Sequence, residues 1–250
     1  MLRKYQSKTL FIVGVGIKTL SHLTEEAKQV IENTERVLFL VNEPLLKEYI
    51  TENAKSFFNL EEIYFNHAYR ADAYNKITEY ILSSLENYDN VGVVAYGHPF
   101  FCASPFLDAA IKAKDNGCIV HAFPGISSLD CMFSDLMIDP TANGLQVYEA
   151  TALINSKITI NTSANLVILQ VGFVNVKTHT HTSENNVDLT YLCDYLKAIY
   201  PEKHSGIIYQ ASLYPSVKPK IDIFQISELS LHKLSSISSI FIPPENNGIS

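Results

Sequence analysis

An arginine and a tyrosine stand four residues apart in the segment YRADAYNKI, at Arg70 and Tyr74. If this segment is helical, both side chains lie on one helix face, at the start of an apolar stripe formed by Ile77, Ile81 and Leu85. A guanidinium held among phenols can stabilise a developing oxyanion, because it stays protonated at neutral pH. The same pattern also fits an aromatic cluster at the edge of the core, with the arginine reaching to water.

Three glycine-containing turns follow apolar, β-type runs: Gly14-Val15-Gly16, Tyr96-Gly97-His98-Pro99 and Pro124-Gly125-Ile126-Ser127-Ser128. Glycine lets the backbone approach a ligand closely, and open α/β sheets bind ligands at the carboxyl ends of their strands. These turns therefore predict a small-molecule site. Each turn also has a plain structural explanation, as a strand-to-helix connection or, at Ser127, as an ordinary helix cap. The first turn does not match the dinucleotide-binding fingerprint, because Thr19 occupies the position of its third glycine.

No metal or disulfide site is predicted. The four cysteines are widely spaced and form no CxxC pair, which is typical of reduced, mostly buried thiols. They are Cys102, Cys118, Cys131 and Cys193. His179 and His181 alternate in the segment THTHTSEN, but no third ligand accompanies them.

Composition restricts the class of protein. The chain has 250 residues, 47% of them hydrophobic, and a net charge of −7. An acidic chain without a Lys/Arg run does not fit a nucleic-acid-binding protein. No signal peptide and no apolar stretch of membrane-spanning length is visible, so we expect a soluble, cytoplasmic protein.

Strands and helices alternate in the first half of the sequence. The apolar runs predict strands at 10–13, 37–41, 91–96 and 118–123. The helix signals are the N-cap residue Thr24, the stripe over 74–86, and Ser104-Pro105, which we expect to cap a helix that ends at Gly117. This order predicts a parallel or mixed sheet covered on both faces.

The second half begins near Gly125 and is richer in strands. Helices are predicted over 127–136 and 189–199, among apolar runs at 145–148, 166–171, 206–209, 221–226 and 237–242. We therefore expect an α/β protein with two subdomains, 1–124 and 125–250, of which the second has a mixed sheet.

Four segments together resemble the tetrapyrrole methylase superfamily, whose members use S-adenosylmethionine: LFIVGVGIKTLSHLT, VVAYGHPFF, FPGISSLDCMFSDLMIDP and LQVYEATALI. The usual tetrapyrrole members carry a Gly-Pro-Gly-Asp turn after the first strand and a Gly-Asp-Pro turn after the third. This sequence departs from both turns, and its departures match the borosin N-methyltransferases, the branch that methylates peptide backbone amides. The resemblance extends from Leu10 to about Pro244 and implies two α/β subdomains with the donor cleft between them.

The resemblance implies which residues form the site. Tyr64, Arg70, Tyr74 and Tyr96 would line the catalytic pocket. The donor would contact Tyr96, His98, Phe101, Ser127, Ala150, Gln170 and Ala211. An amide nitrogen is a poor nucleophile because its lone pair is shared with the carbonyl. Arg70 is therefore expected to stabilise an imidate-like oxygen while Tyr64 or Tyr74 takes the amide proton, and spacing does not decide between the two tyrosines.

The resemblance also implies partners and a product, S-adenosylhomocysteine. Family members form dimers, and many carry their peptide substrate as a C-terminal extension. Since this sequence ends just after its last predicted strand, we expect a separate precursor peptide that is methylated in trans, with a homodimer or a heterotetramer containing the precursor. Two alternatives stay open: a precorrin or porphyrin methyltransferase, and a precursor-binding protein without turnover.

Overall fold

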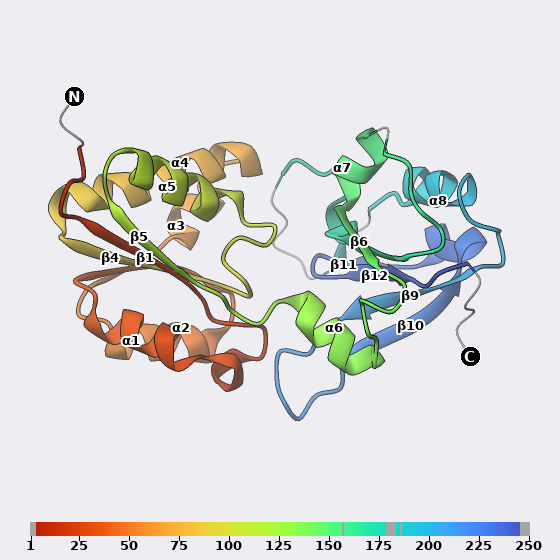
Figure 1. The fold of residues 1–250 in the computed structure, drawn as a ribbon, viewed down its shortest axis with the longest axis horizontal. Helices are drawn as coiled ribbons and strands as arrows, with labels where there is room; N and C mark the ends of the chain where they lie inside the picture. The colour runs from red at the N-terminus through yellow and green to blue at the C-terminus, as the bar shows by residue number, and fades with distance from the viewer. Residues whose placement is uncertain (1–3, 157, 179–183, 186, 246–250) are drawn as a thin grey trace. The chain divides into compact units, whose positions relative to one another are not determined.

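The computed structural model describes residues 4–156, 158–178, 184–185 and 187–245 (Figure 1). The chain divides into two compact units. Unit 1 comprises Met1–Cys131 and Leu213–Val217, and unit 2 comprises Met132–Ser212 and Lys218–Ser250. Each unit contains one five-stranded sheet with helices, which confirms the predicted α/β class. His179 and His181, the histidines considered as metal ligands, lie outside the described residues.

Unit 1 is built on a parallel sheet with the strand order β3-β2-β4-β1-β5. The strands are β1 (Thr9–Gly14), β2 (Arg36–Leu40), β3 (Phe57–Asn59), β4 (Asn90–Ala95) and β5 (Ile119–Phe123). Register places Ala95 opposite both Gly14 and Leu40. The carboxyl ends of three neighbouring strands therefore lie level at one edge, where the glycine turns begin.

Helices cover both faces of this sheet (Figure 1). On one face lie α1 (Glu25–Asn33) and α2 (Pro44–Asn53), and on the other lie α4 (Arg70–Asn87) and α5 (Ser104–Asp115), with the short α3 (Glu61–Phe65) joined to α4. A 3₁₀ turn, η1 (Thr19–His22), precedes α1. Strand alternation explains the two cores: Val93 packs toward α4 and α5, and its neighbour Val94 packs toward α1 and α2.

Local signals set most of these boundaries. Thr24 caps α1, and its hydroxyl accepts a hydrogen bond from the Ala27 N–H at 3.1 Å, as predicted. The prediction that Ser104 caps α5 is wrong by one residue, because Ser104 is already helical and Ala103 precedes it without a side-chain cap. A helix can begin before its proline, since none of the first-turn N–H groups has a helical partner.

Unit 2 has a mixed sheet with the order β10-β9-β12-β7-β6, as expected for the second half. Its strands are β6 (Leu145–Glu149), β7 (Asn165–Leu169), β9 (Ser205–Gln210), β10 (Lys220–Gln225) and β12 (Ser239–Ile242), and β8 (Glu184–Asn185) pairs with β11 (Leu234–Ser235). β6 and β7 are parallel and the other pairs are antiparallel.

The helices of unit 2 give its sheet a buried core. Leu153 of α7 (Ala150–Asn155) and Leu196 of α8 (Thr190–Lys197) pack with Ile168 and Ile208 of the sheet. Tyr209 follows Ile208 in β9, and its hydroxyl donates to Asp135 of α6 (Ser128–Leu136) at 2.6 Å. Two 3₁₀ turns, η2 (Val171–Phe173) and η3 (Ile226–Leu231), complete the unit.

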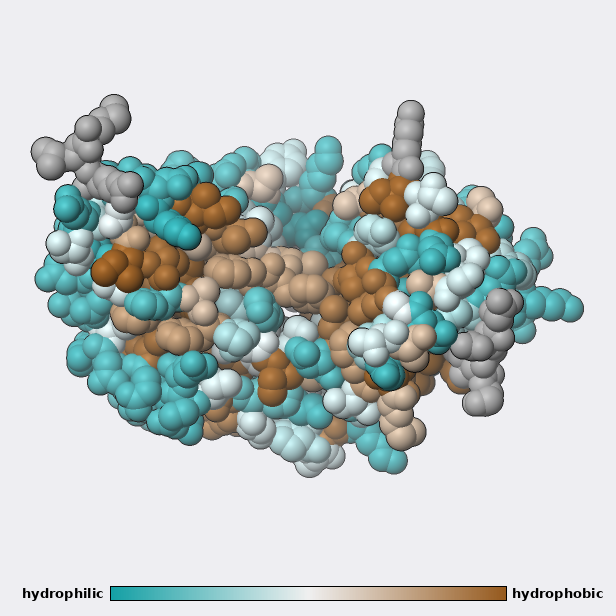
Figure 2. All heavy atoms as spheres, viewed as in Figure 1, coloured by the Kyte–Doolittle hydropathy of each residue, from teal (hydrophilic) through white to brown (hydrophobic). Residues whose placement is uncertain are grey.

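Hydrophilic residues cover much of the face shown in Figure 2, and groups of hydrophobic residues lie between them. Ile111 of α5 and Ile119 of β5 are among the exposed apolar residues. Among the helices of the described part of the chain, none is long and apolar enough to cross a membrane.

Candidate active site

Three of the four predicted pocket residues lie together in unit 1. Tyr64 is on α3, and Arg70 and Tyr74 are on the first turns of α4. The Tyr64 and Tyr74 rings are stacked with centroids 6.0 Å apart, and their side chains are hydrogen-bonded. The charge of Arg70 acts on both phenols. We call these three residues the Tyr–Arg–Tyr cluster.

The two phenols of the cluster are not equivalent. Burial raises the pKa of both Tyr64 and Tyr74 above the usual value, and the positive charge of Arg70 opposes that rise. The hydrogen bond between them acts to raise the pKa of Tyr64 and to lower that of Tyr74. Tyr74 is therefore the better proton acceptor of the pair, a distinction that spacing did not provide.

Arg70 stands where helix electrostatics disfavour it. It is the first residue of α4, an 18-residue helix whose N-cap, Tyr69, makes no side-chain hydrogen bond. A cation in the first turn opposes the helix dipole at a cost of about 0.3–1 kcal/mol. A residue that breaks a local rule often serves function. The position therefore favours a functional role for Arg70 over a purely structural one.

Tyr96 packs against a different hydrophobic core from Tyr64. It directly follows β4, and its N–H donates to the Leu40 carbonyl at 3.2 Å. Its ring packs against the core under α1 and α2, whereas the Tyr64 ring packs against the core under α4 and α5. Burial raises the pKa of Tyr96, with a further contribution from Cys131. The pocket assignment of Tyr96 stays a prediction.

The three glycine turns meet through their backbones. A Cβ placed on Gly14 would lie 2.3 Å from the Gly97 carbonyl oxygen and 2.6 Å from the Gly125 nitrogen. The Gly97 N–H donates to the Gly16 carbonyl at 3.0 Å, and both residues have positive φ. Only glycine allows this approach, so the three turns form one continuous backbone surface at the sheet edge.

Substituting alanine at Gly14 should therefore separate the turns. We expect Gly14→Ala to lower the free energy of unfolding by about 1–3 kcal/mol, because backbone atoms cannot move aside as a flexible side chain can. Urea denaturation measures this change. As a control of similar size, Ala122→Ser on the exposed part of β5 should unfold like the wild type. Equal stability of Gly14→Ala and wild type would contradict the close approach.

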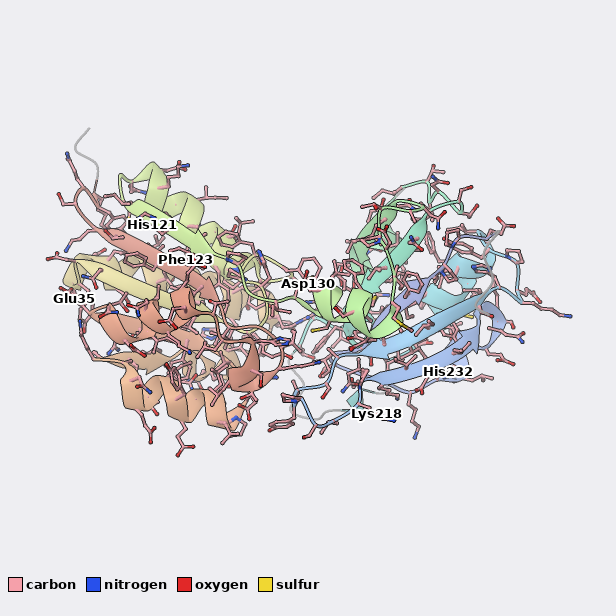
Figure 3. All side chains as sticks on the ribbon, turned by 60° about the horizontal axis from the view of Figure 1, so that its bottom comes forward. Glu35, His121, Phe123, Asp130, Lys218 and His232 are labelled. Carbon is pink, nitrogen blue, oxygen red and sulfur yellow. The ribbon has the colours of Figure 1, made fainter. Side chains whose placement is uncertain are left out.

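His98, Phe101 and Ser127 lie on the loops of this edge. The half-buried His98 accepts a hydrogen bond at Nδ1 from the Phe100 N–H at 3.2 Å, and its carbonyl accepts from the Phe101 N–H at 3.1 Å. The Ser127 N–H and hydroxyl both donate to Asp130 Oδ2 at 2.7 Å. Asp130 stands at the start of α6 (Figure 3). The hydroxyl of Ser127 therefore serves a reciprocal helix cap.

The donor residues predicted in the second half all lie at one edge of the unit 2 sheet. Ala150, Gln170 and Ala211 directly follow β6, β7 and β9. The register pairs Glu149 with Leu169, and β12 aligns β7 with β9. Because these three strands run in the same direction, their carboxyl ends lie level.

Gln170 also has an unusual backbone. Its φ of 54° and ψ of 32° are left-handed, which costs a non-glycine residue about 1 kcal/mol or more. Its neighbours at the edge, Ala150 and Ala211, are small and buried. Strain that persists at a strand end often marks a ligand site.

Sequence reasoning missed two residues near these positions. Cys102 is exposed, has a positive φ of 56° and raises the pKa of Tyr74. Glu43 is buried and caps α2. The Glu43-Pro44 pair was a readable helix start, but nothing near Cys102 marked it as close to α4. In the described parts of the chain, no group of three His, Cys, Asp or Glu residues could hold a metal ion.

Comparison with known proteins gives consistent results. The family model for Tetrapyrrole (Corrin/Porphyrin) Methylases matches residues 9–212. The "methyltransferase/ribosomally synthesized cyclic peptide gymnopeptides precursor" of Gymnopus fusipes is 33% identical over 96% of this chain and 58% of the relative. The "methyltransferase/ribosomally synthesized type III borosin cyclic peptide precursor" of Anomoporia bombycina is 33% identical over 94% of this chain and 28% of the relative. The chain thus spans only part of these curated relatives.

Solved structures share the fold. A uroporphyrin-III-C-methyltransferase from Thermus thermophilus has a TM-score of 0.68 at 16% identity, covering 96% of this chain and 93% of its own. The same enzyme in complex with S-adenosylhomocysteine has a TM-score of 0.64 at 14% identity, covering 94% and 92%. At these identities the likeness concerns the fold.

Proposed function

We propose, given that this chain belongs to the tetrapyrrole methylase family of S-adenosylmethionine-dependent methyltransferases, that it methylates backbone amide nitrogens of a peptide. The observation that carries the proposal is the Tyr–Arg–Tyr cluster, which pairs a fixed cation with two phenols of different basicity. The relatives named as methyltransferase and cyclic-peptide precursor support the same substrate class.

The residues at the two sheet edges fit the methyl donor. When bound, S-adenosylmethionine supplies a methyl group carried on a sulfonium. In unit 1 we assign its contacts to Tyr96, His98, Phe101 and Ser127. In unit 2 we assign them to Ala150, Gln170 and Ala211. The left-handed Gln170 and the two small buried alanines support this assignment, because they leave backbone groups and little side-chain bulk beside the ligand.

Arg70 is proposed to make the amide nitrogen reactive. The amide lone pair is delocalised into the carbonyl, so nitrogen attack requires negative charge on the carbonyl oxygen. A guanidinium directed at that oxygen stabilises this charge as it develops, and it does so without changing its own protonation state. Methylation of the nitrogen would also require a residue of the cluster to accept the amide proton.

Tyr74 is proposed to accept that proton. Burial raises the pKa of Tyr74 above the usual value for tyrosine, whereas the charge of Arg70 and the hydrogen bond with Tyr64 act to lower it and so favour the phenolate. Through that hydrogen bond, Tyr64 would stabilise the base.

The raised pKa of Tyr74 predicts how the rate depends on pH. The reactive form is the deprotonated phenol, and its fraction rises with pH throughout the range below its pKa. The methylation rate should therefore rise about tenfold per unit between about pH 7 and 9, without a plateau. Initial rates at saturating donor measure this slope. A flat profile would rule out a phenolate base.

The experiment that tests the function is direct methylation. The protein is mixed with S-adenosylmethionine and a candidate precursor encoded beside it, and intact mass spectrometry follows the precursor. A ladder of methyl additions, placed on backbone nitrogens by fragmentation, supports the proposal. Methylation of a porphyrinoid precursor, seen as a visible absorbance change, would favour the tetrapyrrole alternative. Peptide binding by calorimetry without donor binding would indicate a partner that lacks turnover.

We also propose that the acceptor is a separate precursor protein and that the enzyme acts as a homodimer. The support for a peptide acceptor is that the relatives are named as methyltransferase and cyclic-peptide precursor together. Sedimentation of the protein with and without precursor distinguishes a dimer, a heterotetramer and a monomer. A monomer that methylates the precursor would contradict the dimer.

A further inference from the structure

Glu43 is a buried carboxylate that three separate segments of unit 1 contact. It is 2% exposed, and it is the one buried acidic residue in the part of the chain that the structure describes. Its Oε2 accepts from the Thr19 hydroxyl at 2.6 Å and the Leu46 N–H at 2.9 Å, and its Oε1 accepts from the Tyr214 hydroxyl at 3.0 Å. A buried carboxylate without such partners would be strongly destabilising.

The carboxylate is held in its charged form. Burial would raise the pKa of Glu43, but hydrogen bonds from Thr19, from the backbone of Leu46 and Leu45, and from Tyr214 outweigh burial and lower it. Helix capping alone does not account for this arrangement. One carboxylate oxygen caps α2 through Leu46, whereas the other accepts from Tyr214, 171 positions away in sequence. The shorter Ser, Thr, Asp and Asn side chains are the usual N-caps.

Two of the segments that contact Glu43 lie next to residues that we assign to the binding of the methyl donor. Thr19 lies in the loop that starts with Gly16, which pairs with Gly97. Tyr214 lies in the strap, our name for Leu213–Val217. The strap belongs to unit 1, although β9 and β10, which it joins, belong to unit 2. It is turned on itself by a bond from the Val217 N–H to the Tyr214 carbonyl at 3.1 Å, and Lys218 follows it (Figure 3).

We propose that Glu43 is a positioning residue for the methyl donor, acting through Tyr214 to hold the strap and so to fix Ala211, two residues before it. This inference rests on the proposed function. Ala211 directly follows β9 at the edge that also carries Gln170, and a strap free to move would let Ala211 shift along with it. Glu43 does not contact the donor in this role.

The test removes the strap contact and keeps the cap. Tyr214→Phe deletes the hydroxyl that reaches Glu43 and leaves the bonds from Thr19 and Leu46 in place. We expect S-adenosylhomocysteine, titrated by calorimetry, to bind this variant about tenfold more weakly. The rate at saturating donor and the melting temperature should stay close to the wild-type values, because Tyr214 is 38% exposed and lies outside the Tyr–Arg–Tyr cluster.

Tyr49→Phe is the matched control. The Tyr49 hydroxyl donates to Glu32 at 3.1 Å, so this variant also loses one phenol–carboxylate bond in unit 1, to a carboxylate other than Glu43. Its affinity for S-adenosylhomocysteine should equal that of the wild type. Hydrogen exchange gives a second readout: the Val217 amide should exchange about tenfold faster in Tyr214→Phe and unchanged in Tyr49→Phe.

The outcomes separate the two proposals. If the wild type binds S-adenosylhomocysteine and Tyr214→Phe binds it equally well, the positioning role is wrong and the proposed function stands. A fall in melting temperature with unchanged affinity would show a purely structural contact and would also overturn the role. Failure of the wild type to bind S-adenosylhomocysteine would overturn the proposed function and, with it, the positioning role.

Discussion

Arg70→Ala should lower the rate of backbone methylation by about 100- to 1000-fold while donor affinity stays at the wild-type level. The loss follows from removing the positive charge that we propose stabilises the amide oxygen, in a half-buried setting that screens charge less than water does. Stability should not fall, because alanine at the first position of α4 removes a cation from the positive end of the helix dipole. Methyl transfer by mass spectrometry, S-adenosylhomocysteine titration and thermal unfolding give the three values.

Lys76→Ala provides the comparison for this substitution. Lys76 is exposed on the same helix and pairs with Glu79, so its loss removes one positive charge from α4 without touching the cluster. Its methylation rate should be that of the wild type. Arg70→Lys should remain well below wild type, since an ammonium cannot reproduce the planar fork of the guanidinium. Full activity of Arg70→Ala would remove the basis of the mechanism.

Tyr74→Phe should reduce the rate by about 100- to 10,000-fold, the range that a positioned acid or base contributes. The ring of phenylalanine keeps the stacking against Tyr64, so the fold should be retained. What is lost is the hydroxyl that is hydrogen-bonded to Tyr64 and that we propose accepts the amide proton. The remaining activity should also lose its dependence on pH between about 7 and 9.

Two further phenol substitutions calibrate this result. Tyr80 lies on the same helix as Tyr74. Its ring packs at a tilt against Phe58, with centroids 4.5 Å apart, and its hydroxyl accepts a long hydrogen bond of 3.5 Å from Arg36, so Tyr80→Phe removes a phenol hydroxyl outside the cluster. It should be fully active. Tyr64→Phe should show a smaller loss than Tyr74→Phe. The reverse order would identify Tyr64 as the base.

The cluster combines two opposing effects on the same phenols. Burial keeps Tyr64 and Tyr74 protonated, while Arg70 lowers the pKa of both. The same burial also strengthens the interaction between Arg70 and a developing negative charge. A site of this kind favours charge on the substrate more than on the resting enzyme, which is the condition for transition-state stabilisation.

Local signals in the sequence determined much of the fold. Thr24 with the two acids after it defined α1, and the stripe Ile77, Ile81 and Leu85 defined α4. These signals act within a few residues, through capping and helical periodicity. The apolar runs ending in glycine turns likewise predicted β1, β4 and β5, and with them the edge where the turns meet.

Short elements escaped prediction for the same reason. β3 has three residues and α3 has five, too few for a period to show. α3 carries Tyr64, so the sequence placed this residue only as lying upstream of Arg70. The cap at Ser104 was misplaced because serine and proline are both compatible with several positions in the first turn.

By itself the sequence determined the α/β class, the family resemblance and the candidate residues, because each rests on residue types at short or fixed spacings. Only the tertiary structure decided that the Tyr64 ring stacks on Tyr74, that Tyr96 packs on the other face of the sheet, and that Glu43 meets Tyr214. Each of these is a relation between different elements of the fold. Burial and hydrogen bonding between elements depend on packing, which no local pattern of residues encodes.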